Sequence, residues 1–99
     1  MMDDPVREAL TLTRTLPAGV IAAIFARYGR PLAVELPASE EQVTLSNGAL
    51  VRCVLLRTPV DVIANHWFIL EHPGAETVGM PGPLFAAALA ALSRSQVGE

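Results

Sequence analysis

The sequence predicts a single α+β domain in which an antiparallel sheet of about four strands packs with two or three helices. Three observations support this prediction. Apolar residues recur at helical spacing early in the chain, two long apolar segments have the character of paired strands, and an alanine-rich segment near the end favours a helix. A chain of 99 residues has room for one core, so residues 1–99 are expected to form one domain.

The N-terminal part is expected to contain two helical segments. Residues 6–12 are predicted to form one short helix or turn, because the β-branched threonines at 11, 13 and 15 weaken a helix. A better helix is predicted over residues 17–28, where apolar side chains follow helical spacing. Gly29 is expected to end this helix in the left-handed conformation.

The middle of the chain is expected to supply the strands. Alternating apolar residues predict a strand over 31–36, and a short strand over 43–45 leads into Asn47-Gly48. Asn-Gly is the strongest signal for a two-residue hairpin, because both residues tolerate positive φ. Residues 49–56 and 60–70 are predicted to be two long antiparallel strands joined by a short turn.

These two long strands are apolar on both faces, which suggests a sheet covered on both sides. One cover would be a helix, and the other a second layer or another subunit. Residues 71–82 contain Pro-Gly pairs and are predicted to be a loop. Residues 83–94 are predicted to form the last helix.

The composition points to association and argues against several partners. Of the residues, 52% are hydrophobic and 17% charged, an apolar surplus for a small domain that favours a homodimer. Net charge is −3 and the arginines are scattered, so nucleic-acid binding is not expected. Residues 1–7 start acidic and lack the basic and apolar regions typical of a signal peptide, and no apolar run approaches bilayer length, so we expect a cytoplasmic protein without a membrane partner.

Arg52 is the most informative candidate residue, because it is a lone charge in the apolar run from Leu50 to Leu56. A guanidinium is rarely buried without a partner, since its desolvation is costly. Its planar fork suits a ligand that carries a carboxylate. The alternative is a structural ion pair with one of three acidic residues, or an exposed strand edge. Those acidic residues are Glu35, Asp61 and Glu71.

Asn65, His66 and Trp67 form a polar interruption in the second long strand. Asn65 and Trp67 would share one face, and His66 the other. With a short turn, His66 or Asn65 would lie near Arg52 or Cys53 across the ladder. His66 is either a general acid or base, or simply hydrogen-bonded in place. Trp67 is expected to anchor the core or an interface.

Cys53 is the single cysteine, so no internal disulfide is possible. It is interpreted as a small core residue, and a thiol made reactive by the neighbouring Arg52 is the alternative. One Cys and two His do not make a familiar closed zinc site, so neither a metal nor a cofactor is expected.

Three stretches carry a family resemblance. They are Thr15–Val34 (TLPAGVIAAIFARYGRPLAV), Leu50–Leu70 (LVRCVLLRTPVDVIANHWFIL) and the helical segment Gly82–Gly98. In them the chain resembles the first part of the chorismate pyruvate-lyase family, whose fold also includes effector-binding domains of some GntR-type regulators. The resemblance implies that Arg52 matches the strand arginine that contacts the carboxylate of the substrate or product. The later strands of that family, with an acidic active-site residue, have no counterpart here.

Two functional hypotheses follow. The first is a small chorismate-lyase-like domain that binds an aromatic or other carboxylic acid through Arg52, with Asn65, His66 and Trp67 nearby. For an enzyme, the resemblance implies elimination of pyruvate from chorismate to give 4-hydroxybenzoate, but no catalytic residue is assigned. The second is a non-catalytic module for dimerisation or protein interaction.

Overall fold

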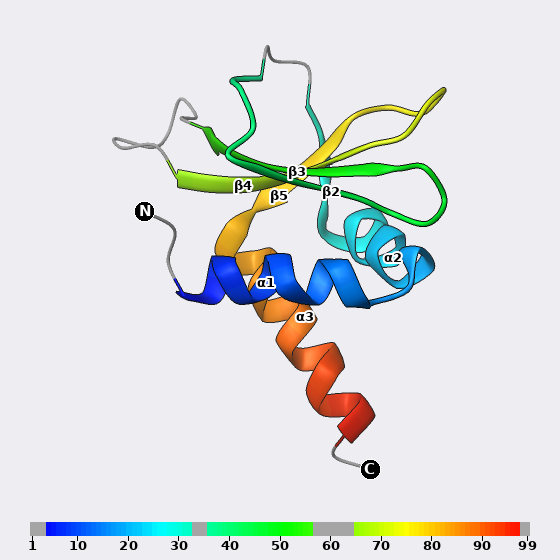
Figure 1. Cartoon of the computed structure of the whole chain (residues 1–99), viewed down its shortest axis with the longest axis vertical. Coiled ribbons are helices and arrows are strands. Elements are labelled where there is room, and N and C mark those ends of the chain that lie inside the picture. Colours follow the sequence, from blue (N-terminus) through cyan, green and yellow to red (C-terminus); the bar gives the residue numbers. More distant parts are fainter. Residues whose placement is uncertain (1–3, 33–35, 57–64, 98–99) are drawn as a thin grey trace.

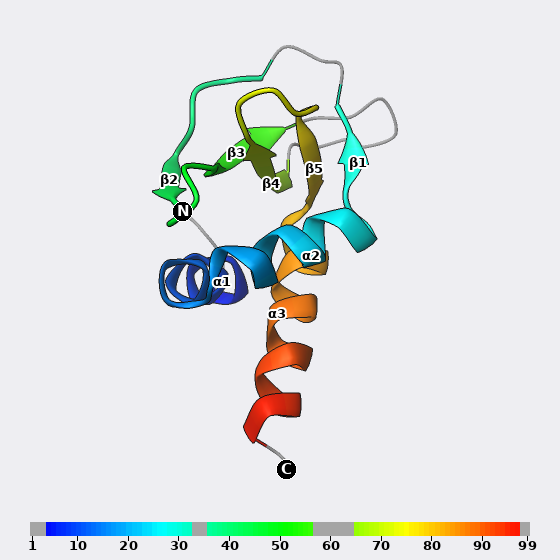
Figure 2. The same cartoon turned by 90° about the vertical axis from the view of Figure 1, so that its right-hand side faces the viewer.

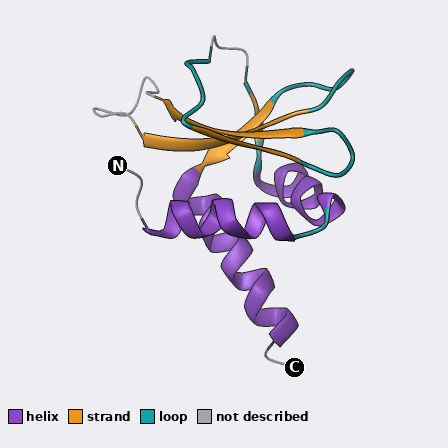
Figure 3. Cartoon of the chain, viewed as in Figure 1, coloured by secondary structure: helices purple, strands orange, loops and turns teal. Residues whose placement is uncertain are grey.

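Three helices cover one face of a five-stranded sheet in the computed structural model, which describes residues 4–32, 36–56 and 65–97 (Figure 1). The strand order is β1-β5-β4-β3-β2, and neighbouring strands are antiparallel. The α+β prediction is confirmed, with one strand more than expected (Figure 3). The elements are α1 (Asp4–Thr15), α2 (Ala18–Tyr28), β1 (Arg30–Pro31), β2 (Glu41–Thr44), β3 (Leu50–Leu56), β4 (Asn65–Glu71), β5 (Val78–Pro81) and α3 (Gly82–Val97).

Helix α1 is longer than the short helix or turn expected from its threonines. The hydroxyls of Thr11, Thr13 and Thr15 donate to backbone carbonyls three or four residues earlier, at 3.2, 2.7 and 3.1 Å. Such bonds back to the helix are a common way to accommodate these side chains. They satisfy even Thr13, which is only 1% exposed. The threonines are therefore compatible with a helix of 12 residues.

Helix α2 has the predicted extent, but Gly29 ends it for another reason than expected. Its φ is −76°, so the prediction of a left-handed residue is wrong. The Gly29 N–H donates to the Phe25 carbonyl at 2.8 Å. A Cβ on Gly29 would lie 2.5 Å from that oxygen and would also meet the side chain of Val78. Close packing of α2 against β5 therefore requires glycine here.

The hairpin predicted at Asn47-Gly48 joins β2 to β3, with a loop one residue longer than expected. The Leu45 N–H donates to the Ala49 carbonyl at 2.8 Å, which leaves residues 46–48 in the loop. Gly48 has a φ of 88°, whereas Asn47 does not take positive φ. Asn47 instead accepts a bond from the Ala49 N–H through Oδ1 at 3.0 Å. A three-residue loop with a left-handed glycine is a standard hairpin form.

The two long strands pair as predicted along their described lengths. Leu50 lies opposite Glu71, and Leu56 lies opposite Asn65. The expected turn and the start of the second strand fall in residues 57–64, outside the described residues. Side chains alternate between the two faces of a strand. The even-numbered positions of β3, which include Arg52, therefore share one face, and the odd-numbered positions turn toward the helices.

The loop predicted over residues 71–82 is wrong in part, because Val78–Pro81 form strand β5 between β4 and β1. Gly79 allows close packing on this strand, since a Cβ there would lie 2.5 Å from Leu32 Cδ1. Pairing on both sides therefore overrides the low strand propensity of glycine and proline.

The strand predicted over residues 31–36 is shorter than expected. Strand β1 contains Arg30 and Pro31, and Leu36 lies outside any strand. Residues 33–35 are outside the described residues. Strands β1 and β2 occupy opposite edges of the sheet. Residues 36–40, which we call the crossover segment, pass over the sheet face opposite the helices as they lead to β2 (Figure 2).

The main core lies between the sheet and the helices. Phe85 of α3 contacts Phe25 of α2 and Phe68 of β4, with ring centroids 5.2 and 4.5 Å apart. All three rings are at most 2% exposed. Burial of one such side chain stabilises a fold by about 1.5–3 kcal/mol, so this aromatic cluster helps to hold α2 and α3 against the sheet.

Candidate functional site

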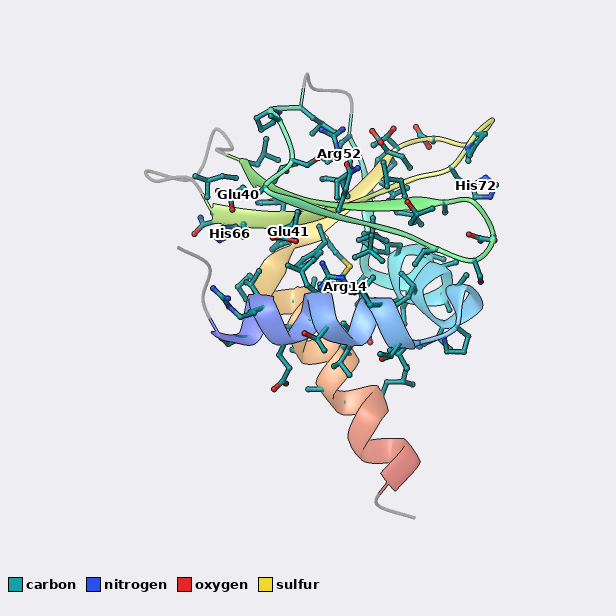
Figure 4. All side chains as sticks on the ribbon, viewed as in Figure 1. Arg14, Glu40, Glu41, Arg52, His66 and His72 are labelled. Carbon is teal, nitrogen blue, oxygen red and sulfur yellow. The ribbon has the colours of Figure 1, made fainter. Side chains whose placement is uncertain are left out.

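Arg52 lies on the face of the sheet that the helices leave uncovered (Figure 4). Its Nε donates to Ser39 Oγ, its Nη2 donates to the Pro37 carbonyl at 3.0 Å, and its Nη1 donates to Glu71 Oε2 at 3.1 Å. Ser39 and Pro37 belong to the crossover segment, and Glu71 ends β4. The guanidinium therefore fastens the crossover segment to the sheet.

Glu71 is one of the three acidic partners considered for Arg52, and the ion pair is present. The side chains are 19% exposed for Arg52 and 35% for Glu71, so water screens the pair in part. An ion pair of this kind contributes at most about 1 kcal/mol. The other two candidate partners, Glu35 and Asp61, lie outside the described residues.

A small apolar cluster lies beside Arg52 under the crossover segment. Val54, Leu56 and Ile69 are buried on this face. Three partly buried residues pack against them: Leu32, Leu36 and Trp67. Leu36 comes from the crossover segment, so this segment of the same chain covers part of the second face of the sheet.

The register of β3 and β4 separates the predicted site residues. Trp67 lies opposite Val54 and Asn65 opposite Leu56, on the same face as Arg52. His66 lies on the other face, as predicted. However, Arg52 faces Ile69 and Cys53 faces Phe68. The expectation that His66 or Asn65 lies across the ladder from Arg52 or Cys53 is therefore wrong.

His66 instead contacts the crossover segment from the helix side of the sheet. Its Nε2 lies 2.7 Å from Oε1 of Glu40. The His66 side chain is 14% exposed and that of Glu40 is 43% exposed. The contact is a salt bridge only when His66 is protonated. Together with Arg52, it gives the crossover segment two polar attachments, to β3 and to β4.

Glu41, the first residue of β2, accepts a bond through Oε1 from Nη2 of Arg14 in α1 at 3.2 Å.

Cys53 is fully buried, which confirms its interpretation as a core residue. Burial, followed by the nearby carboxylates of Glu40 and Glu41, raises the pKa of Cys53 to about 11. At neutral pH the thiol is protonated, which argues against a nucleophilic role.

No local sequence pattern indicates that Ser39 and Pro37 are partners of Arg52. Their role depends on the path of the crossover segment over the sheet, which no pattern within residues 36–40 reveals. His72 directly follows Glu71 in the β4–β5 turn, and its side chain is exposed, as expected for a loop residue (Figure 4).

No known protein family, curated protein sequence or solved structure matches the chain. The resemblance to the chorismate pyruvate-lyase family therefore stays an untested expectation. Among the residues that the structure describes, no three His, Cys, Asp or Glu side chains are grouped to hold a metal ion. In the same residues, no helix is long and apolar enough to cross a membrane. The cytoplasmic location stays a prediction.

Proposed function

We propose that this domain binds a carboxylic acid at Arg52, beneath the crossover segment. The observation that carries the proposal is the pair of oxygens that now occupies one edge of the guanidinium. Ser39 Oγ accepts from Nε and the Pro37 carbonyl accepts from Nη2. Nε and Nη2 present their N–H groups side by side, which is the arrangement that binds both oxygens of a carboxylate.

In this proposal the two crossover oxygens hold the place of the ligand. Ser39 Oγ and the Pro37 carbonyl are neutral acceptors, whereas a carboxylate would bond to the same two N–H groups as an anion and add the attraction between opposite charges. The crossover segment would move aside as it loses its bonds to Arg52. Glu71 would keep its bond to Nη1 and hold the guanidinium in orientation.

The surroundings of Arg52 favour an acid with an apolar body. Val54 and Ile69 are buried beside it, and Trp67 is partly buried on the same face. An aromatic ring could stack against such side chains while its carboxylate meets Arg52. Glu71 opposes a second negative charge at the site, so a monocarboxylic acid is preferred to a dicarboxylic acid.

Thermal shift and the fluorescence of Trp67, the single tryptophan, test the proposal with benzoate and 4-hydroxybenzoate. The wild-type chain should bind, Arg52→Gln should not, and Arg14→Gln should bind as wild type. Ser39→Ala should bind about fivefold more tightly, because it removes one internal competitor worth about 1 kcal/mol. Absence of binding by both wild type and Ser39→Ala would sink the proposal.

Lyase activity is the finer form of this proposal and rests on the family resemblance alone. Incubation with chorismate, followed by the absorbance of 4-hydroxybenzoate, tests it directly. If the acid binds and no product forms, the domain is a binding module without this activity.

A further inference from the structure

Helices α2 and α3 carry apolar side chains on faces that the fold leaves open. Residues 18–26 and 83–92 contain no polar side chain at all. Helices that are apolar all round are normally buried. Yet in α3 the side chain of Leu84 is 40% exposed, and Ala87 and Ala91 are exposed one and two turns further on. In α2, Ala23 and Ala26 are exposed.

Helix α3 projects from the body of the domain along its longest axis, beyond α1 and α2 (Figures 1 and 2). It meets α2 in an apolar groove of about 440 Å³. Val20, Ala23 and Ile24 line the α2 side, and Ala88, Ala91 and Leu92 line the α3 side. Arg27 and Tyr28 form the rim, with the guanidinium 5.5 Å from the ring centroid.

A second groove, of about 460 Å³, lies between α1 and α3, but its surroundings differ. It contains Glu8, and the exposed positions of α1 include Arg7, Thr11 and Arg14. Glutamate is depleted at the core of protein interfaces, whereas tyrosine and arginine are enriched there. The residue types therefore favour the groove between α2 and α3 as the one that a protein partner covers.

We infer that a second copy of this chain packs its α3 antiparallel into the groove between α2 and α3, around a two-fold axis. A two-fold interface requires one patch that is complementary to itself. Ala91 is exposed on α3 and also lines the α2–α3 groove, so the same patch of each copy supplies a helix side and a groove. Residues 83–92 carry no charge, so two antiparallel α3 helices bring no like charges together over this stretch.

Sedimentation velocity on the whole chain over micromolar to millimolar concentrations tests the inference. Wild type should sediment at about 21 kDa, twice the 10.5 kDa of one chain. Ala91→Arg should weaken the dimer by roughly 100-fold or more, because it places an unpaired charge in the centre of the interface. Ala75→Arg, the same change at an exposed position of the β4–β5 turn, should leave the dimer unchanged.

Cross-linking keeps the inference testable if Ala91→Arg fails to fold. Ala91→Cys should form a disulfide-linked dimer under mild oxidation, whereas Ala75→Cys, which lies outside the groove, should not. The native Cys53 is buried and does not compete for the cross-link. A chain that stays monomeric at all concentrations overturns the inference. So does a dimer that Ala91→Arg leaves intact, or a monomer that instead sediments with phosphatidylcholine–phosphatidylglycerol vesicles.

Discussion

Replacement of Arg52 by leucine should destabilise the fold by about 2 kcal/mol. The change removes the bonds to Ser39 and Pro37, each worth about 1 kcal/mol net. It also removes the pair with Glu71, worth roughly 0.5 kcal/mol because the Glu71 side chain is 35% exposed and screened by water. Leucine would regain about 0.5 kcal/mol by apolar burial beside Val54 and Ile69.

Urea unfolding followed by far-ultraviolet circular dichroism measures this loss. Trp67 fluorescence provides a second probe, on the same sheet face as Arg52. Arg14→Leu is the matched control: its ion pair with Glu41 joins side chains that are 50% and 43% exposed, and its loss should cost less than about 0.5 kcal/mol. If the two variants are equally stable, Arg52 does not fasten the crossover segment, and the reasoning on its three bonds is refuted.

Two further predictions concern Gly29 and Cys53. Gly29→Ala should destabilise by about 2 kcal/mol, because its Cβ would lie 2.5 Å from the Phe25 carbonyl, which cannot move as a side chain does. Gly19→Ala, a helical position with nothing within 4 Å, should stabilise by roughly 0.5–1 kcal/mol, and urea unfolding compares the two. The pKa of Cys53 is raised from 9.0 to about 11 in the fold, so the unfolded chain loses the proton first and stability should fall between pH 9 and 11. Cys53→Ala should show a shallower fall over the same range, and an identical slope in both proteins would contradict the burial of a neutral thiol.

The elements that sequence reasoning predicted well are those with long patterns of their own. Helix α2 and strands β3 and β4 have enough apolar positions for one period to dominate. Strand β5 was missed because its four residues include Gly79 and Pro81, and its strand character comes from pairing with β4 and β1. That pairing is a tertiary effect, which local propensity does not contain.

The candidate site divides in the same way. Glu71 was among the predicted partners of Arg52 because a buried guanidinium needs a counter-charge. Ser39 and Pro37 were not, since they depend on the crossover segment returning over the sheet. The place of His66 was missed because the register, with Leu55 opposite it, is set by pairing and is not visible in the strand sequence.

The two proposed surfaces lie on opposite sides of the sheet, and this makes them separable. The α2–α3 groove belongs to the helical layer, whereas Arg52 lies on the face crossed by residues 36–40 (Figure 2). A dimer formed through α3 would leave the Arg52 face of both copies outside the dimer interface. Loss of the dimer in Ala91→Arg should therefore leave acid binding unchanged, and Arg52→Gln should leave the dimer intact. A change that abolished both properties would indicate unfolding and would identify neither surface.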